Sequence, residues 1–438
     1  MIKSVLYNFE IIGDFDTINY YRSLTPMNTE SMPAPTVNGI TETIYRDKTV
    51  DPEITYYVRF GSVYEGEEKI SDEIIVKTFN KLWESSEIVI DYFLNNSNLY
   101  GGTTATASLE TFGLDLTGDV KWRGAVIGPD NKIYCIPHQA PDILIIDPET
   151  GTATRTDFGL NLIDDYKWMG AALGPDGKIY CAPYNSPDIL IIDPVNGTAI
   201  RNNFGLDLAT NFKYSGIVLG KNDLLYCIPY SATNGILVID PMTNSAIVKS
   251  YGLDLNSTFK FRSASINKNG IIHAASYNHN DTLFINTNID TSWIGALGNS
   301  GTWAGSVLGP NNKIYNIPFT STNVYTADEN YNLSMIVLSI TGSSKWSGGA
   351  LGPDGKIYCI PHNSVNFLII DPMKDTAALS NLGITMSETN KFDGAILGPD
   401  NKIYCIPYSA PYIAVISFDP SIPLVSDQIV RSPHYNKY

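Results

Sequence analysis

The stretch that decides the fold is KWMGAALGPDGKIYCAPYNSPDILIIDPVNGTAIRNNFGLDL, residues 167–208. It begins with a small, apolar run, WMGAALG, as expected of a strand in crowded surroundings. GPDGK then predicts a hairpin turn, because Pro, Asp and Gly favour the backbone angles of tight turns. KIYCAP and DILIIDP predict a second and a third strand, and the polar stretch ending in FGLDL predicts a fourth. The stretch therefore predicts one sheet of four strands.

This unit recurs from about residue 109 onward. Each copy has an aromatic residue that is followed twelve positions later by a second ring, and the units measure 46, 46, 47, 42, 43 and 46 residues between the second rings. That period is typical of four-stranded propeller blades. Seven copies predict an all-β fold with a seven-bladed β-propeller over about 108–420. The pairs of rings are Trp122/Tyr134, Trp168/Tyr180, Tyr214/Tyr226, Phe261/His273, Trp303/Tyr315, Trp346/Tyr358 and Phe392/Tyr404.

The two ends of the repeat array indicate how the ring closes. SLETFGLDL, residues 108–116, matches the fourth strand of the other units but precedes the first unit. The last unit lacks a fourth-strand sequence of this kind. We therefore predict that the N-terminal strand 108–116 completes the last blade, because joining the two ends removes an open sheet edge. The C-terminal tail, 421–438, gives no structural signal.

Residues 1–79 predict a separate small β-sandwich. Strand-like stretches alternate with turn signals, and Tyr56, Val58 and Phe60 are expected to point to one side of their strand. The Val50-x-Pro52-x-x-x-Tyr56 approach, the YYVRFGSVYEGEEKIS run and the closing SDEIIVKT strand resemble a fibronectin type III domain. Residues 80–107 are interpreted as a linker or junction.

Charge and composition limit the function. The 438 residues carry a net charge of −16, and residues 1–108, with 16 acidic and 8 basic side chains, hold −8 of it. This balance argues against nucleic acid or an anionic membrane surface as the main partner. The sequence has neither an apolar run long enough for membrane insertion nor a signal peptide, so we expect synthesis in the cytoplasm. The five cysteines occupy equivalent positions in different blades, which indicates packing rather than disulfides or metal binding.

The register of the repeat maps residues onto one face of the propeller. The start of the first strand and the end of the second strand share a face, which in propellers commonly surrounds the ligand-binding opening. Sixteen positions after the first ring of each unit stand only rings, and we treat them as candidate ligand-binding residues. They are His138, Tyr184, Tyr230, Tyr277, Phe319, His362 and Tyr408.

A second set on the same face consists of lysines directly before the first ring. Rings stack on sugars and lysines pair with carboxylates or phosphates, so the two sets together predict an acidic glycan as ligand. The alternative is packing, because a repeat propagates each side chain whether or not it binds anything. Packing is the interpretation we prefer for the Trp122-type rings, and both interpretations stay open for the His138-type rings. The lysines are Lys121, Lys167, Lys213, Lys260, Lys345 and Lys391.

Motifs for catalysis are not found. The sequence contains no GxSxG, HExxH, P-loop or glycine fingerprint, so we predict no catalytic residue, metal or cofactor. A metal-assisted propeller lactonase or lyase stays open as an alternative, as does a structural scaffold for protein docking. The fourth unit has lost the Gly, Pro and Cys signature and gained His273 and His279, which indicates either a specialised pocket or drift.

The unit WxGAxLGPDGKIYCIPYNxPDILIIDPxTGTA resembles propeller repeats of phage and prophage tail-associated proteins. Such proteins also combine a small fibronectin-like module with a ligand-facing domain. The resemblance implies a recognition or adhesion protein of a virion tail, released by lysis and acting outside the cell. Its expected partners are a host surface glycan or receptor and, through the N-terminal domain, other tail proteins. Homo-oligomerisation is left open, because no heptad pattern indicates it.

Overall fold

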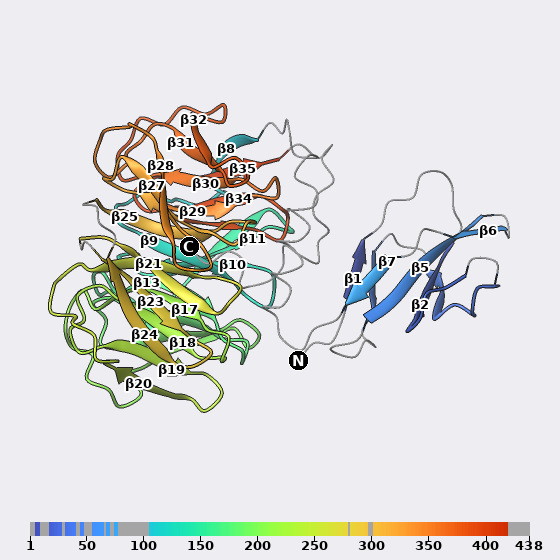
Figure 1. Ribbon diagram of the computed structural model, residues 1–438, viewed down its shortest axis with the longest axis horizontal. Helices are drawn as coiled ribbons and strands as arrows, with labels where there is room; N and C mark the ends of the chain where they lie inside the picture. Colours follow the sequence, from blue (N-terminus) through green and yellow to red (C-terminus); the bar gives the residue numbers. More distant parts are fainter. Residues whose placement is uncertain are drawn as a thin grey trace. The chain divides into compact units, whose positions relative to one another are not determined.

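The structure is a computed structural model that describes residues 5–8, 17–28, 31–40, 44–47, 55–64, 67–70, 74–77, 105–278, 281–296 and 301–418. The chain divides into two compact units, and each is described by itself. Strands β1–β7 belong to the first unit and strands β8–β35 to the second (Figure 1). In the described residues we find no helix with the length and apolar character that a bilayer crossing requires.

The N-terminal unit contains antiparallel sheets. One has the order β3-β2-β5-β6, with β7 also paired to β5, and the other joins β1 to β4. In β5 the side chains of Tyr56, Val58 and Phe60 are buried and those of Tyr57 and Arg59 are not, which confirms the predicted alternation. The fibronectin type III assignment stays a prediction, and Val50 and Pro52 lie outside the described residues. The strands are β1 (Val5–Asn8), β2 (Thr17–Ser23), β3 (Val37–Ile40), β4 (Ile44–Asp47), β5 (Thr55–Tyr64), β6 (Glu67–Ile70) and β7 (Ile74–Lys77).

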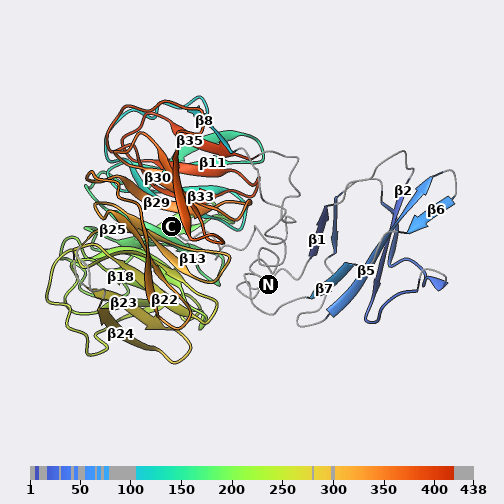
Figure 2. The ribbon, with the colours of Figure 1, turned by 45° about the horizontal axis from the view of Figure 1, so that its top comes forward.

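The second unit is a β-propeller, and its described residues form seven four-stranded antiparallel sheets, as predicted (Figures 1 and 2). We number these sheets as blades 1–7 in chain order.

Blades 1–4 are β9 (Trp122–Ile127), β10 (Ile133–Pro137), β11 (Ile143–Asp147) and β12 (Thr152–Thr156); β13 (Trp168–Leu173), β14 (Ile179–Pro183), β15 (Ile189–Asp193) and β16 (Thr198–Asn202); β17 (Tyr214–Leu219), β18 (Leu225–Pro229), β19 (Ile236–Asp240) and β20 (Ser245–Lys249); and β21 (Phe261–Ile266), β22 (Ile271–Ser276), β23 (Asp281–Asn286) and β24 (Thr291–Ala296).

Blades 5–7 are β25 (Trp303–Leu308), β26 (Ile314–Pro318), β27 (Asn323–Ala327) and β28 (Leu333–Val337); β29 (Trp346–Leu351), β30 (Ile357–Pro361), β31 (Phe367–Asp371) and β32 (Thr376–Ser380); and β33 (Phe392–Leu397), β34 (Ile403–Pro407) and β35 (Ile413–Ser417) together with β8 (Thr106–Glu110).

Blade 7 is built from both ends of the repeat array. Strand β8 pairs antiparallel with β35, with Ser108 opposite Val415, and the two lie side by side in both views (Figures 1 and 2). The observed strand differs slightly from the predicted 108–116. It begins at Thr106 and ends at Glu110, and Leu114 then donates a backbone hydrogen bond to Thr111 in a turn. Pairing of β8 with β35 covers the edge that the last three strands would otherwise expose.

The hydrophobic core lies between neighbouring blades. One cluster combines Tyr134 and Ile143 of blade 1 with Trp168 and Leu190 of blade 2. The first rings are buried, and each tryptophan indole donates to a backbone carbonyl twenty residues later, as from Trp122 to Asp142 at 2.8 Å. This burial confirms the packing interpretation of the Trp122-type rings. The five cysteines are also buried and free.

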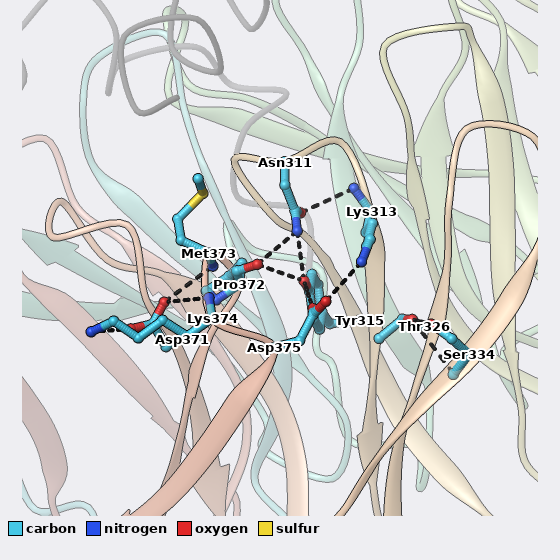
Figure 3. Close-up of polar contacts among 10 residues, drawn as sticks. All are labelled: Asn311, Lys313, Tyr315, Thr326, Ser334, Asp371, Pro372, Met373, Lys374 and Asp375. Carbon is cyan, nitrogen blue, oxygen red and sulfur yellow. Dashed lines mark hydrogen bonds and ion pairs between the residues drawn. The ribbon is translucent and has the colours of Figure 1, made fainter. Parts of the chain in front are cut away.

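Polar contacts also join neighbouring blades away from the axis. Between blades 5 and 6, the amide of Asn311 donates to the carbonyl oxygen of Pro372 at 2.8 Å, and Lys313 and the Tyr315 hydroxyl contact the Asp375 carboxylate (Figure 3). These contacts connect the turn after β25 in blade 5 to the turn after β31 in blade 6. The repeated Asp of the outer turn serves turn structure, because Asp371 accepts backbone hydrogen bonds from the two residues after Pro372.

Candidate functional site

The seven candidate rings come together in one closed circle, which we call the aromatic collar. Six neighbouring pairs have ring centroids 5.3–5.7 Å apart, and the last pair, His138 and Tyr408, closes the circle at 6.5 Å. These separations and the tilted ring planes are those of attractive aromatic pairs. In order, the collar consists of His138, Tyr184, Tyr230, Tyr277, Phe319, His362 and Tyr408.

Backbone hydrogen bonds between the blades position the collar. The N–H of each collar residue donates to the carbonyl of the residue before the first ring of its own blade, as from His138 to Lys121 at 2.9 Å. Six collar carbonyls, all except that of Tyr277, in turn accept from the lysine N–H of the next blade, as from Lys167 to His138 at 2.9 Å. A belt of these bonds links one blade to the next, and it holds each collar residue directly after its second strand.

Most collar side chains are buried against one another. His138 has no exposed surface and Tyr184, Tyr230, Phe319 and His362 expose 8% or less. Tyr277 and Tyr408, which belong to the same circle, are half-buried. Ring edges and these two tyrosines are therefore what the collar offers to a ligand.

The six candidate lysines do not line the opening, which corrects the expectation of a lysine set that contacts a ligand. They expose 4% or less of their surface. Each amine donates to the carbonyl of the residue three positions earlier, as from Lys167 to Asp164 at 2.6 Å. The same contact is made by Lys121, Lys213, Lys260, Lys345 and Lys391.

The lysines therefore have a structural role in the connections between blades. Sequence register indicated the correct end of the propeller, but it could not show that the aliphatic stems are covered and that the amines turn back to the backbone. Burial also lowers the pKa of Lys121, Lys167, Lys213, Lys260 and Lys391 to about 8.

A charged layer that the sequence interpretation missed lies on the axis beside the collar. Asp393 accepts hydrogen bonds from Arg123 Nε at 2.8 Å, Arg262 Nη2 at 2.6 Å and the Ser347 hydroxyl at 3.0 Å. These residues line a pocket of about 30 Å³ together with Ser263, enough for about one or two waters. Two guanidinium groups and one carboxylate give the layer a net charge of +1.

The arginines connect the axial layer to the collar. The guanidinium carbon of Arg123 lies 5.3 Å from the ring centroid of Tyr408, and that of Arg262 lies 5.1 Å from the ring centroid of Phe319. Such distances allow cation–π attraction. Although burial by itself would raise the pKa of Asp393, the two guanidinium groups hold it well below its usual range.

The two collar histidines are held neutral. Nδ1 of His138 lies 2.9 Å from the carbonyl oxygen of Trp168, so this nitrogen carries the proton, and Nε2 lies 3.3 Å from Nη1 of Arg123. Burial and the nearby Arg123 charge hold the pKa of His138 well below its usual range. His362 repeats the arrangement, with Nδ1 at 2.8 Å from the Phe392 carbonyl oxygen, and burial lowers its pKa as well.

Three further rings lie beside one sector of the collar, and we call them the aromatic platform. Tyr166, Phe212 and Phe259 directly precede the lysines of blades 2–4 and expose 37–38% of their surface. Their centroids lie 5.2, 5.3 and 5.1 Å from those of the collar rings His138, Tyr184 and Tyr230, respectively. The platform is therefore an exposed extension of a mostly buried collar.

Both missed sets could have been read from the repeat register. The residue after each first ring faces the axis, and it varies among Arg123, Met169, Ser215, Arg262, Ala304, Ser347 and Asp393. The residue two positions before each first ring is aromatic only in blades 2–4. In both cases the signal is variation within a repeat whose other positions stay alike.

The remaining histidines give no second site. His273 is buried, Nε2 lies 2.9 Å from the Thr282 hydroxyl, and burial lowers its pKa to about 3. His279 lies outside the described residues. Within the described ranges, no three His, Cys, Asp or Glu side chains group closely enough to hold a metal ion.

Comparisons with known proteins agree on the fold. No family model matches the chain, and no curated protein matches its sequence. A streptogramin B lyase structure is 14% identical with a TM-score of 0.59, and it covers 72% of this chain and 98% of its own. Virginiamycin B lyase from Staphylococcus aureus is 12% identical with a TM-score of 0.58, covering 72% of this chain and 99% of its own.

The extracellular domain of a hybrid two-component system from B. thetaiotaomicron is 15% identical, has a TM-score of 0.54, and covers 71% of this chain and 42% of its own. At these identities the likeness shows the fold alone. This chain is similar to these proteins as a β-propeller made of four-stranded sheets.

Proposed function

We propose that this protein is a non-enzymatic recognition protein that binds a saccharide on the collar face of its propeller. The observation that carries the proposal is the closed circle of seven rings around one end of the axis. Aromatic rings attract the apolar faces of sugars, and binding sites in propellers commonly surround the axial opening. The collar is also pre-organised, because the inter-blade backbone hydrogen bonds hold its members.

The structure changes the expected ligand class. An acidic glycan was expected because lysines were placed beside the rings, but their amines donate to backbone carbonyls instead. The axial arginines are paired with Asp393. Accessible cations therefore give no support to a carboxylate-bearing ligand, and we retain the saccharide without the acidic requirement.

A glycan array probed with the full chain tests the proposal. The double variant Tyr277→Ser/Tyr408→Ser removes the two half-buried collar rings, and we expect on the order of tenfold weaker saccharide binding. Tyr277→Phe/Tyr408→Phe keeps both rings and is the matched control, with little change expected. Equal binding by the serine variant and the wild type would contradict a role for the collar.

We further propose a place for the protein in a phage or prophage tail, mounted through its N-terminal unit and directed at a host surface glycan or receptor. The sequence of the repeat unit supports this location, since it resembles the repeats of tail-associated propellers. Mass spectrometry of purified virions tests it: the chain is expected among the virion proteins, and its absence from them while it is abundant in the lysate would contradict the proposal.

A propeller lyase is the second candidate function. Two of the structures similar in fold are those of lyases, and one of these is a catalytically inactive histidine variant of virginiamycin B lyase with quinupristin. Here two neutral collar histidines carry the proton on Nδ1, and Nε2 of His138 lies 3.3 Å from Nη1 of Arg123. An unprotonated Nε2 is the form of imidazole that can accept a proton. The axial donors do not fit a divalent cation, because the carboxylate is already paired with two guanidinium groups.

Incubation with quinupristin, followed by mass spectrometry, separates the two candidates. A recognition protein leaves quinupristin intact. Conversion of quinupristin to a product that no longer forms with the variant His362→Ala would favour the lyase.

A further inference from the structure

We propose that the aromatic platform, Tyr166, Phe212 and Phe259, is the principal saccharide subsite, and that it takes neutral or amino sugars in preference to sugars bearing carboxylates. This inference rests on the proposed function and names the residues and the ligand class. The platform covers blades 2–4, so it makes binding asymmetric in a ring whose other parts repeat.

The platform residues have a backbone conformation that is costly for a bulky side chain. Their φ angles are 51°, 55° and 55°, in the left-handed region, where a bulky side chain costs about 1–2 kcal/mol per residue. Blade 7 has Asn390 at the equivalent position with φ 53°, and blade 6 has Ser344 with φ 52°. Because asparagine tolerates this conformation better, the fold itself does not require rings at these positions.

The platform rings are only partly buried, so burial of their apolar surface does not fully offset the cost of the left-handed backbone. The three platform rings remain 37–38% exposed, whereas the collar rings that they contact expose 8% or less. The platform rings meet the collar rings of the preceding blades edge to face or tilted, and Phe212 also contacts Phe259 at 6.1 Å between centroids. Three adjacent exposed rings backed by an aromatic circle offer flat apolar surface to a ligand.

The platform is held rigidly from behind. The N–H of Phe212 donates to Oδ1 of Asn185 at 2.8 Å, and the Phe212 carbonyl accepts from the N–H of Ser231 at 2.9 Å. The N–H of Phe259 donates to the Ser231 hydroxyl at 3.2 Å. A surface pre-organised in this way loses little conformational freedom on binding.

Polar groups around the rings indicate the chemical class of the ligand. Asp164 and Asp165 directly precede Tyr166 and both are exposed; Asp164 forms an ion pair with Arg201 at 3.3 Å, and Gln139 donates to Asp165 at 3.3 Å. The Asp165 carboxylate and the Gln139 amide next to the rings suit hydroxyl and ammonium groups of a sugar, while the negative charge of Asp165 repels a uronic or sialic acid. A second protein surface is the competing occupant, and a wild type that binds no saccharide would favour it.

The matched control is Tyr331. It is an aromatic residue at φ 63° with 38% exposure, and it packs edge to face against Phe284 and Trp293. It lies in the turn between β27 and β28, at the end of the propeller opposite to the end of β26, where the collar residue Phe319 follows. It therefore shares the conformation and exposure of the platform rings without sharing their location.

The test compares the full-length wild type, the triple variant Tyr166→Asn/Phe212→Asn/Phe259→Asn and the control Tyr331→Asn on a glycan array, with calorimetry on the saccharides bound by the wild type. We expect the triple variant to lose about tenfold or more in affinity and the control less than about twofold. Thermal unfolding checks that both variants fold.

Each other outcome has a defined meaning. Binding of no saccharide by the wild type overturns the proposed function, and this inference with it. Saccharide binding that the triple variant retains, or that Tyr331→Asn weakens equally, overturns the platform subsite and leaves the proposed function standing. Preferential binding of sialylated or uronate-containing glycans overturns the ligand class.

Discussion

At the scale of single residues, the axis shows why one position in the repeat is almost always glycine. A Cβ on Gly305 would lie 2.7 Å from the Cα of Gly348, and one on Gly348 would lie 2.7 Å from the Cα of Gly394. The inner strands approach so closely that side chains are excluded there. Blade 4 is the exception, because it has Ser263 at φ 64°, with a buried hydroxyl that has no hydrogen-bond partner among the described residues.

We predict that Ser263→Gly stabilises the protein by about 1 kcal/mol, because it removes both a left-handed serine and an unsatisfied buried hydroxyl. Chemical denaturation of the variant and the wild type measures the difference. Gly216→Ser is the reverse substitution in the neighbouring blade, and it should destabilise, since Gly216 faces the Ser263 backbone. A loss of stability in Ser263→Gly would show that the hydroxyl has a bonded role.

The Asp393 carboxylate carries a second prediction at this scale. Its Asn variant leaves Arg123 and Arg262 buried without a counter-charge, which should cost about 3–5 kcal/mol. Because the folded state holds the pKa of Asp393 well below its usual value, the stabilisation is present above the unfolded pKa and is lost as pH falls below it.

Urea unfolding of the wild type and Asp393→Asn between pH 6 and pH 3 checks this prediction. The difference in stability should shrink as the pH falls. The exposed variant Asp165→Asn should follow the wild type at each pH. A difference that stays constant down to pH 3 would rule out the ion pair as its source.

At the scale of elements, the connections between blades determine where the collar stands. The buried lysine of each connection binds carbonyls of its own loop and, in several blades, of the neighbouring blade, as from Lys121 to Ala410 at 3.0 Å. Repeat register predicted that rings and lysines gather at one end of the propeller. It could not predict which of them reach solvent, because that depends on how each connection folds back over its lysine.

The same connections predict an unusual dependence on pH. Burial lowers the pKa of five lysines from 10.5 to about 8, so between these values the unfolded chain binds more protons than the folded one. Stability should therefore rise as the pH increases from 7.5 to 9.5. Above about pH 10 the buried tyrosines, such as Tyr226 with a pKa raised to about 12, reverse the trend.

Urea midpoints at pH 7.5 and 9.5 measure the rise, and Lys260→Met should show a smaller one because it lacks one of the five groups. Stability that does not rise over this range would mean that the bonded amines stay charged in the folded protein.

At the scale of the whole molecule, charge and recognition are separate. The net charge is −16, and the cations placed near the collar are either bonded to carbonyls or paired with Asp393. If ring faces provide the affinity, saccharide binding should change less than about twofold between roughly 0.05 and 0.5 M NaCl. Calorimetry at both salt concentrations checks this. A steep decrease with salt would indicate that charged contacts dominate.

The sequence by itself determined the propeller, the number of blades and the end at which seven rings gather, because the repeat copies strand and turn signals at a constant period. The tertiary structure alone decided which side chains a ligand can reach. Closing the ring buries the lysines and most of the collar, brings Arg123, Arg262 and Asp393 together from three blades, and leaves Tyr166, Phe212 and Phe259 exposed. Burial and contacts between blades depend on distances across the ring, which a repeat pattern along the chain does not contain.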